Sequence, residues 1–336
     1  VRDEAGREYK GLRQLFPDDR VSVYTLDPET SRARDSKTDG ELRIAYSQIE
    51  PEDIDLLAGL MGLNEVMTAA MVILRRRLGA GWVQRVMEEE IPEDIARLVE
   101  TGRLASGTLE ALQRRFESFF PRMGFLVPQL DHDPVEEIFR RLSLGQSVVL
   151  EFGIYGNSLA AYVLVANYLT RRIHARYVQR KNLAAGKKVD EPKPLVIVIE
   201  EAHKFLDPQV AEHTIFGTIA RELRKYNVTL LLVDQRPSGI DEEVMSQIGT
   251  RVTYLLDNEA DIRAVFSGVS GAAALREVLA RLDTRQQALV LGHAVPMPVV
   301  LRARQYDQDF YASLGSVEGE ALTKRAKKGT ETLFGA

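Results

Sequence analysis

Residues 195–238 read LVIVIEEAHKFLDPQVAEHTIFGTIARELRKYNVTLLLVDQRPS. The segment contains two short apolar runs, LVIVI and TLLLV, and each run ends in polar residues. Continuous apolar runs of this length are typical of strands that are buried on both faces of a parallel sheet. Residues 209–226, between the two runs, are long enough for a helix. The segment therefore predicts a strand–helix–strand unit with a right-handed crossover.

Polar side chains gather where the two predicted strands end. Glu200 and Glu201 follow the first strand and Gln235 follows the second, at the edge where open α/β sheets bind their ligands. One carboxylate can hold Mg²⁺, usually through water, while the other positions or deprotonates an attacking water molecule. Gln235 can sense a γ-phosphate or orient that water. The simpler alternative is that the acids cap a helix beginning near Pro208 or pair with Lys204.

Two arginines, Arg221 and Arg224, lie at the end of the predicted intervening helix in the segment RELRK. Cations at a helix C-terminus interact favourably with the helix dipole, which is one explanation for them. The other explanation is an arginine finger that acts across a subunit boundary, with Arg224 as the better candidate. His203 has no second histidine at ligand spacing, so a histidine metal site is not expected.

The composition of the chain is that of an ordinary globular protein. Its 336 residues are 45% hydrophobic and carry a formal net charge of −5, which argues against a generally basic nucleic-acid binder. The absence of cysteine excludes disulfides and thiolate metal sites and agrees with the cytoplasmic location that we expect. No apolar run approaches the roughly 18 residues of a membrane span, so no membrane association is expected.

The rest of the chain surrounds a helical block. Between residues 49 and 120, apolar residues recur at helical spacing, and Pro51 followed by two acids marks the first helix start. We expect the block to be an insertion packed on the sheet, or alternatively a lid or a subunit contact. Elsewhere the pattern predicts strands at 20–26, 42–45, 147–152, 251–256, 288–292 and 299–304, helices at 133–142, 157–180, 241–248, 258–266 and 272–282, and a polar loop at 181–194.

Several motifs in a fixed order resemble one family. They are DEAGREY (3–9), EEAH (200–203), RELRKY (221–226), QRPS (235–238) and SQIGTR (246–251). In this order they resemble the HerA family, the HerA/FtsK-class RecA-like hexameric ATPases that translocate DNA. The resemblance spans roughly residues 3–305. It implies an α/β fold, with a RecA-like P-loop NTPase core whose mainly parallel sheet is flanked by helices, plus an all-helical insertion.

The resemblance implies ATP and Mg²⁺ as cofactors and gives roles to the residues at the strand ends. Glu200 matches the magnesium-associated acid, which holds the ion through water and belongs to the cofactor site. Glu201 matches the catalytic acid, and Gln235 matches the phosphate-sensing polar residue.

The same resemblance places further candidates outside the strand ends. Arg224 best matches the arginine that acts on the neighbouring subunit's nucleotide, with Arg251 as a second candidate. Arg221 remains a catalytic candidate from its place at the end of the predicted helix. Asp3 or Glu4 matches a cofactor-side acid that follows the first motor helix; the spacing allows either residue.

One family motif is missing from the chain. No G-x-x-x-x-G-K-[ST] segment, the Walker A loop, occurs, and the single Gly-Lys at Gly186-Lys187 stands in the wrong context. We expect this loop, with a β-barrel-like domain, in an upstream part of a longer protein, so this chain alone should bind ATP poorly. The expected organisation is the start of the ATPase core at 1–48, a helical insertion at 49–125, the RecA-like core at 126–312 and a C-terminal tail at 313–336.

The resemblance implies an ATP-driven translocase or helicase subunit of a homo-hexameric ring that acts on double-stranded DNA. Family members often work with a nuclease in DNA end processing, and some act in phage defence. Lys181, Lys187 and Lys188 are candidate DNA contacts, unless their loop is a solvated linker. Two other functions stay open: a conjugation- or secretion-type ring ATPase, and a nucleotide-gated scaffold for an effector protein. A two-metal nuclease would need further ligand acids that the sequence does not offer at sensible positions.

Overall fold

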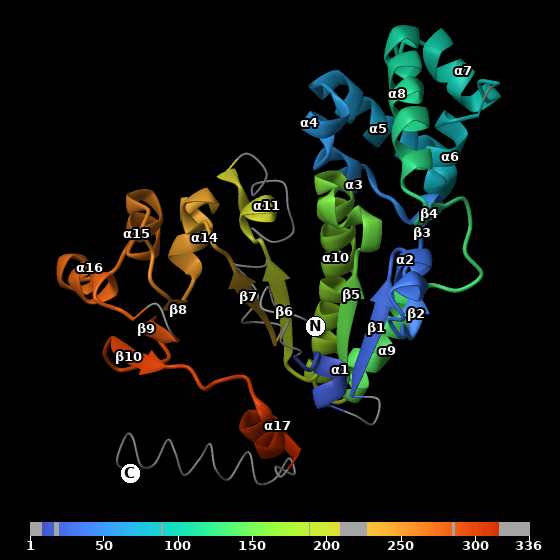
Figure 1. Ribbon diagram of the computed structural model, residues 1–336. Coiled ribbons are helices and arrows are strands. Elements are labelled where there is room, and N and C mark those ends of the chain that lie inside the picture. Colours follow the sequence, from blue (N-terminus) through green and yellow to red (C-terminus); the bar gives the residue numbers. More distant parts are fainter. Residues whose placement is uncertain are drawn as a thin grey trace. The chain divides into compact units, whose positions relative to one another are not determined.

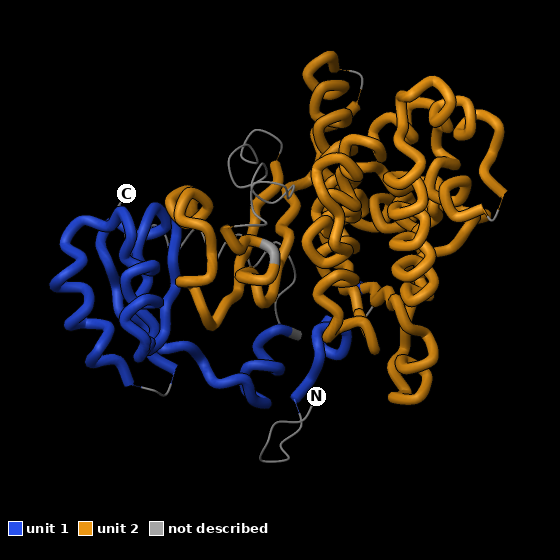
Figure 2. Tube along the Cα trace, turned by 90° about the horizontal axis from the view of Figure 1, so that it is seen from above, with its two compact units in different colours: residues 1–21, 249–336 blue, residues 22–248 orange. Residues whose placement is uncertain are grey.

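The computed structural model describes residues 9–16, 20–88, 90–187, 189–208, 227–283 and 286–315. It combines parallel strand pairs, an antiparallel sheet and many helices (Figure 1), so the predicted α/β class is confirmed. The chain divides into two compact units, one made of residues 1–21 and 249–336 and the other of residues 22–248 (Figure 2). The division into core, insertion and tail that the sequence suggests stays a prediction.

The larger unit begins with a three-stranded sheet. Strand β1 (Val21–Thr25) lies between β2 (Gly40–Glu41) and β5 (Ser147–Glu151), and β1 is parallel to β2. Helix α2 (Pro28–Ala33) follows β1 and is capped by Asp27, whose side chain accepts a hydrogen bond from the Thr30 N–H. The strand predicted at 42–45 is present only as β3 (Ile44–Ala45), which pairs in parallel with β4 (Leu126–Val127).

A block of helices separates β3 from β4 in the sequence. Its buried centre is aromatic: the rings of Trp82 and Phe116 lie 5.6 Å apart, and those of Phe116 and Phe120 lie 5.1 Å apart. The Trp82 indole N–H donates to the Ile49 carbonyl at 2.9 Å, which satisfies a polar atom that burial would otherwise penalise. The block contains α3 (Pro51–Asp55), α4 (Ala58–Met61), α5 (Glu65–Leu78), α6 (Trp82–Val86), α7 (Glu93–Glu100) and α8 (Ser106–Phe119), joined by 3₁₀ turns η1 (Tyr46–Gln48), η2 (Gly79–Gly81) and η3 (Phe120–Arg122).

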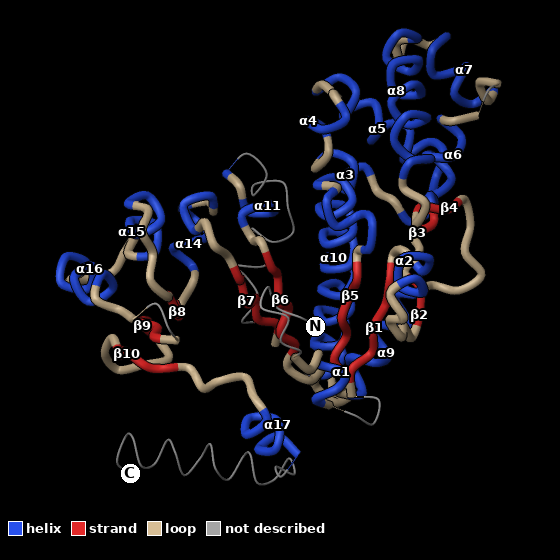
Figure 3. Tube along the Cα trace, in the orientation of Figure 1, coloured by secondary structure: helices blue, strands red, loops and turns tan. Residues whose placement is uncertain are grey.

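Two helices flank β5. Helix α9 (Pro134–Leu144) has Asp133 as its N-cap and proline at its first position, as the sequence predicts. After the turn η4 (Gly153–Asn157), helix α10 (Leu159–Ala185) runs for 27 residues (Figure 3). The predicted loop at 181–194 is therefore wrong at its start, because the good helix formers of KNLAA continue the helix up to Gly186.

Strands β6 (Leu195–Glu200) and β7 (Val228–Val233) form the predicted parallel pair, with Glu200 opposite Val233. The prediction that the first strand is buried on both faces is wrong. Val196 and Val198 are each 55% exposed, whereas the alternate residues of the strand pack against the core. One face of the pair packs against the core, where Ile199 is buried and Leu195 and Ile197 are partly buried, and the other face is exposed. The crossover helix and its handedness fall on residues 209–226, outside the described residues.

Short elements after the two strands complete the larger unit. They are α11 (His203–Leu206), η6 (Pro237–Gly239) and α14 (Glu242–Gln247), the last capped by Asp241. No helix in the described ranges combines the length and the apolar character needed to cross a bilayer.

The smaller unit has its own hydrophobic core, which includes Val265, Phe266, Leu279, Leu289 and Leu291. Its sheet is antiparallel in the order β10–β9–β8. Helix α17 was not predicted; its residues lie partly in the predicted tail. The unit contains β8 (Thr250–Thr253), β9 (Gln287–Gly292) and β10 (Val299–Arg302), with helices α1 (Leu12–Leu15), α15 (Glu259–Val265), α16 (Ala272–Ala280) and α17 (Gln308–Gly315).

Candidate functional site

The carboxyl ends of β6 and β7 bring the three predicted strand-end residues to one edge. Glu200 is the last residue of β6 and lies opposite Val233, the last residue of β7. Glu201 and Gln235 therefore follow within two residues on adjacent strands. The backbone continues the pairing past the strand ends, because the Ala202 N–H lies 3.4 Å from the Val233 carbonyl oxygen. This edge is the candidate functional site.

Glu201 has an unusual backbone. Its φ is +53°, a left-handed conformation that non-glycine residues adopt only when their surroundings impose it. The Lys204 N–H donates to the Glu201 carbonyl at 2.9 Å, which closes a tight turn between β6 and α11. The side chain is 41% exposed. Backbone strain of this kind concentrates at functional sites, where it fixes the direction of a side chain.

Asp234 and His203 form a hydrogen-bonded pair that the sequence analysis did not identify. The Asp234 side chain is 5% exposed and lies 2.9 Å from the His203 Nδ1 atom. The same carboxylate accepts from the backbone N–H of His203 at 2.7 Å and of Arg236 at 2.5 Å. Both residues lie just past the ends of the paired strands, where Glu200 is opposite Val233. The signal in the sequence was an aspartate directly after β7 and a histidine three residues after β6.

The imidazole of His203 also faces the predicted catalytic acid. Its Nε2 atom lies 3.9 Å from a carboxylate oxygen of Glu201. The other ring nitrogen is taken by Asp234. In the parts of the chain that the structure describes, no group of three or more histidine, cysteine, aspartate or glutamate side chains could hold a metal ion.

Helix α10 forms one side of the site through Tyr162. Burial raises the pKa of the Tyr162 hydroxyl, and the negative charges of Glu200 and Glu201 raise it further. The Lys204 ammonium lies 5.7 Å from the centre of the Tyr162 ring. Among the described residues it makes no ion pair with either glutamate, so the alternative in which Lys204 neutralises the acids is not observed.

The remaining catalytic candidates lie elsewhere or outside the described residues. Arg251, on β8, donates to the carbonyls of Val265 at 2.5 Å and Ser267 at 2.9 Å within its own unit, and burial lowers its pKa. Its arginine-finger role therefore competes with a structural one and stays a prediction. Arg221, Arg224, Asp3 and Glu4 lie outside the described residues.

The lysines proposed to contact DNA differ in their surroundings. Lys181 lies in helix α10 and not in a loop, and its ammonium pairs with Glu191 at 2.8 Å. Lys187 is exposed just after the helix, with a φ of +55°. Lys188 is outside the described residues. Lys181 is thus a weaker candidate than Lys187.

The strand-end carboxylates fit Mg²⁺ better than a metal held by protein ligands alone. Mg²⁺ keeps several waters and binds through one or two carboxylates together with substrate phosphates. Glu200 is exposed at the end of its strand and offers one such carboxylate. The described residues include no glycine-rich loop of the type that cradles phosphates.

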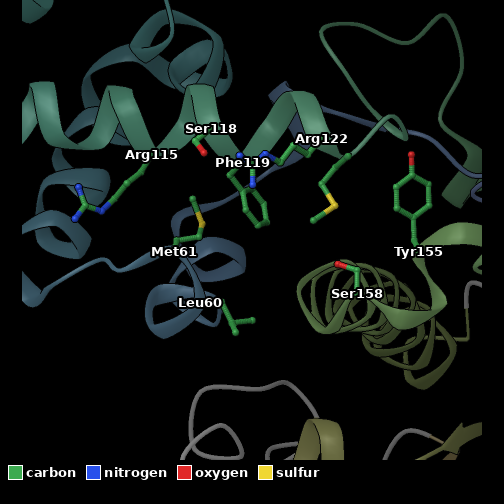
Figure 4. A pocket seen from close by; sticks show the side chains of 9 residues that line it. Leu60, Met61, Arg115, Ser118, Phe119, Arg122, Tyr155 and Ser158 are labelled. Atoms are coloured by element: carbon green, nitrogen blue, oxygen red, sulfur yellow. The ribbon is translucent and has the colours of Figure 1, made fainter.

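A separate cavity of about 410 Å³ lies between the helical block and the start of α10 (Figure 4). The hydroxyl of Tyr155 accepts a hydrogen bond from the Gly124 N–H at its edge, at 3.0 Å. None of the residues that line this cavity belongs to β6, β7 or the turns after them. They are Leu60, Met61, Arg115, Ser118, Phe119, Arg122, Met123, Tyr155 and Ser158.

Comparison with known proteins gives one family match and several curated relatives. Residues 3–173 match the family described as "Helicase HerA, central domain". The chain is 28% identical over 218 residues to a protein of Saccharolobus solfataricus named "DNA double-strand break repair helicase HerA", a match that covers 64% of this chain and 42% of that protein. It is 33% identical over 119 residues to a Pyrococcus furiosus protein of the same name, covering 34% of this chain and 21% of the relative. The chain thus spans less than half the length of these relatives.

Two solved structures are also similar to the chain. VirB4 of Thermoanaerobacter pseudethanolicus has a TM-score of 0.49 and 14% identity, covering 87% of this chain and 83% of that chain. The genome packaging NTPase B204 of Sulfolobus turreted icosahedral virus 2, in complex with ATP-gammaS, has a TM-score of 0.32 and 14% identity, covering 50% of this chain and 72% of the other.

Proposed function

The chain belongs to the HerA helicase family, and on that premise we propose that it carries the hydrolytic half of an ATP-driven motor subunit that moves along double-stranded DNA. The observation that supports this most directly is the shared edge of β6 and β7. It presents Glu200, Glu201 and Gln235 together, with the Glu201 backbone held in a strained conformation. Two acids and one polar amide at adjacent strand ends suit the hydrolysis of a nucleotide phosphate.

Each residue of the edge has a proposed role. Glu201 orients and accepts a proton from the water that attacks the γ-phosphate. Glu200 would hold Mg²⁺ through water, and the ion would supply positive charge to the phosphates of ATP. Gln235, on the adjacent strand, lies where it can hydrogen-bond the γ-phosphate. The phosphate-binding loop would come from the upstream part of the longer protein.

The motor would work as a ring. The resemblance implies six copies, with an arginine from one subunit completing the nucleotide site of the next; Arg224 is the first candidate, followed by Arg221 and Arg251. Exposed Lys187 and its neighbour Lys188 are the better candidates for contact with DNA phosphates. A nuclease partner in DNA end processing, or an effector in phage defence, is part of the same proposal.

The test is ATP hydrolysis by the full-length protein that contains this chain, with and without double-stranded DNA, beside Glu201→Gln. We expect DNA to stimulate turnover and Glu201→Gln to lower kcat by about 10²-fold or more, because a general base typically contributes that much. Glu117→Gln is the matched control, because Glu117 is an exposed acid on α8. It should leave turnover unchanged.

Other outcomes would change the assignment. Turnover that ignores DNA would favour the nucleotide-gated scaffold over the motor. Full activity in Glu201→Gln would remove the catalytic role from that residue. No turnover in the full-length protein, with no phosphate-binding loop upstream, would show that the protein is not an ATPase.

A further inference from the structure

Asp234 is the most buried acid at the candidate site, and it connects both strand ends. Its carboxylate accepts from the Arg236 N–H on one side and from the His203 N–H and Nδ1 on the other. The first bond shapes the turn that carries Gln235. The other two fix the start of α11, directly after Glu201. A carboxylate with several donors in a nearly buried position is strongly oriented, because each bond restricts its rotation.

His203 is held from several directions. Its backbone and its ring both bind Asp234. Gly239 packs against the root of this side chain, since a Cβ built on Gly239 would lie 3.1 Å from the His203 Cβ. Because Nδ1 is directed at Asp234, the ring nitrogen that remains, Nε2, is the one that faces Glu201 at 3.9 Å.

We propose that the Asp234–His203 pair positions the Glu201 carboxylate and couples it to the turn that carries Gln235. The inference deepens the proposed function and rests on it. His203 is a positioning residue: its Nε2 atom lies 3.9 Å from the Glu201 carboxylate, and we give it no contact with nucleotide or metal. His203 acts by orienting the Glu201 carboxylate, the group that accepts a proton from the attacking water.

The physical need for such a device follows from the local geometry. The Glu201 side chain is 41% exposed and projects from a strained backbone, so water competes for its orientation. A displacement of about 1 Å in a catalytic group can cost about 10²-fold in rate. A γ-phosphate contact that shifts Gln235 also shifts Asp234, its neighbour in the chain. Because Asp234 binds His203, this shift would reach the Glu201 carboxylate through the His203 ring.

The kinetic test uses three variants of the full-length protein: His203→Asn, Asp234→Asn and the double variant. Asparagine keeps a donor near the Nδ1 position but has no atom at Nε2. We expect each single change to lower kcat about tenfold or more with little change in KM for ATP, because orientation at the reacting centre is lost while ATP binding is not. The double variant should be no slower than the slower single variant, because both changes break the same coupling.

Controls separate positioning from folding. His132→Asn changes an exposed histidine before α9 and should leave kcat and Tm unchanged. His203→Gln places an amide near the Nε2 position and should recover part of the rate lost in His203→Asn. Wild-type kcat in His203→Asn, or a rise in KM with kcat unchanged, would overturn the proposal.

A second readout does not depend on turnover. In the 336-residue chain, ¹⁵N chemical shifts of the five histidine rings can be assigned by the loss of one signal in His203→Asn. We expect the His203 ring shifts to change in Asp234→Asn, which alters the partner of Nδ1, and to change in Glu201→Gln, which alters the group that faces Nε2. A His203 ring that ignores both changes would contradict the coupling. If the full-length protein hydrolyses no ATP, the proposed function fails, and the ring shifts still decide whether the coupling exists.

Discussion

Asp53 is the clearest buried charge of the molecule among the described residues. Its side chain is fully buried, and Arg171 donates to both of its oxygens, at 2.6 and 3.2 Å. The pair joins helix α3 of the helical block to α10. We expect Arg171→Met to lower the free energy of unfolding by about 3 kcal/mol, because it leaves a buried carboxylate without its counter-ion. Chemical denaturation measures this, and Arg76→Met, at an exposed position on α5, should stay within about 0.5 kcal/mol of wild type.

The unfolding free energy of Arg171→Met should also depend on pH, in a direction set by the pKa of Asp53. Burial raises the pKa of the Asp53 carboxyl, and the Arg171 charge lowers it in part. Without Arg171 the pKa rises further above that of the unfolded chain. A raised folded pKa favours the folded state at low pH and disfavours it as the pH increases. The stability deficit of Arg171→Met should therefore shrink as the pH falls toward the pKa of an exposed aspartate. A deficit that grows on acidification would mean that Asp53 is not the cause.

Single residues also show what the sequence can and cannot reveal about the site. That Glu200, Glu201 and Gln235 reach one edge follows from two apolar runs and the rule for parallel strands. The Asp234–His203 pair does not follow in the same way, because it depends on which residues face each other after the strands end. Their types are visible in the sequence, but their register becomes visible only once β6 and β7 are aligned residue by residue.

Among the elements, the β8–β9 pair depends on one glycine. Gly292 has a φ of +104° opposite Thr250, and a Cβ there would collide with the Gly249 carbonyl oxygen. We expect Gly292→Ala to lower the free energy of unfolding by more than about 2 kcal/mol, from strain and collision together. Gly268→Ala is the matched control, because its φ is +72° but open space surrounds it. It should cost about 1 kcal/mol. If thermal unfolding gives the two variants the same loss of unfolding free energy, the collision at position 292 is relieved by backbone movement.

Elements were predictable where their signals are local. The Asp133-Pro134 start of α9 is a local signal, and it was correct. The predicted burial of β6 on both faces was wrong, because LVIVI has apolar residues at every position. Such a run looks the same whether one face or two are covered. The end of α10 was placed too early because the polar residues of its last turns are also good helix formers.

At the scale of the whole molecule, the chain carries the acids that we propose for a nucleotide site but no phosphate-binding loop in its sequence. Tight ATP binding in this type of site depends on the backbone N–H groups and the lysine of that loop. We therefore expect the 336-residue chain to bind ATP with a Kd weaker than about 1 mM, and the longer protein to bind at least about tenfold more tightly. Calorimetric titration of both proteins measures the difference, with ADP as a second ligand. Glu201→Gln in the longer protein is the control, because it should remove hydrolysis while leaving ATP bound. Tight binding by the 336-residue chain alone would mean that its own residues hold the phosphates, and the division of the nucleotide site between two parts of a longer protein would then be wrong.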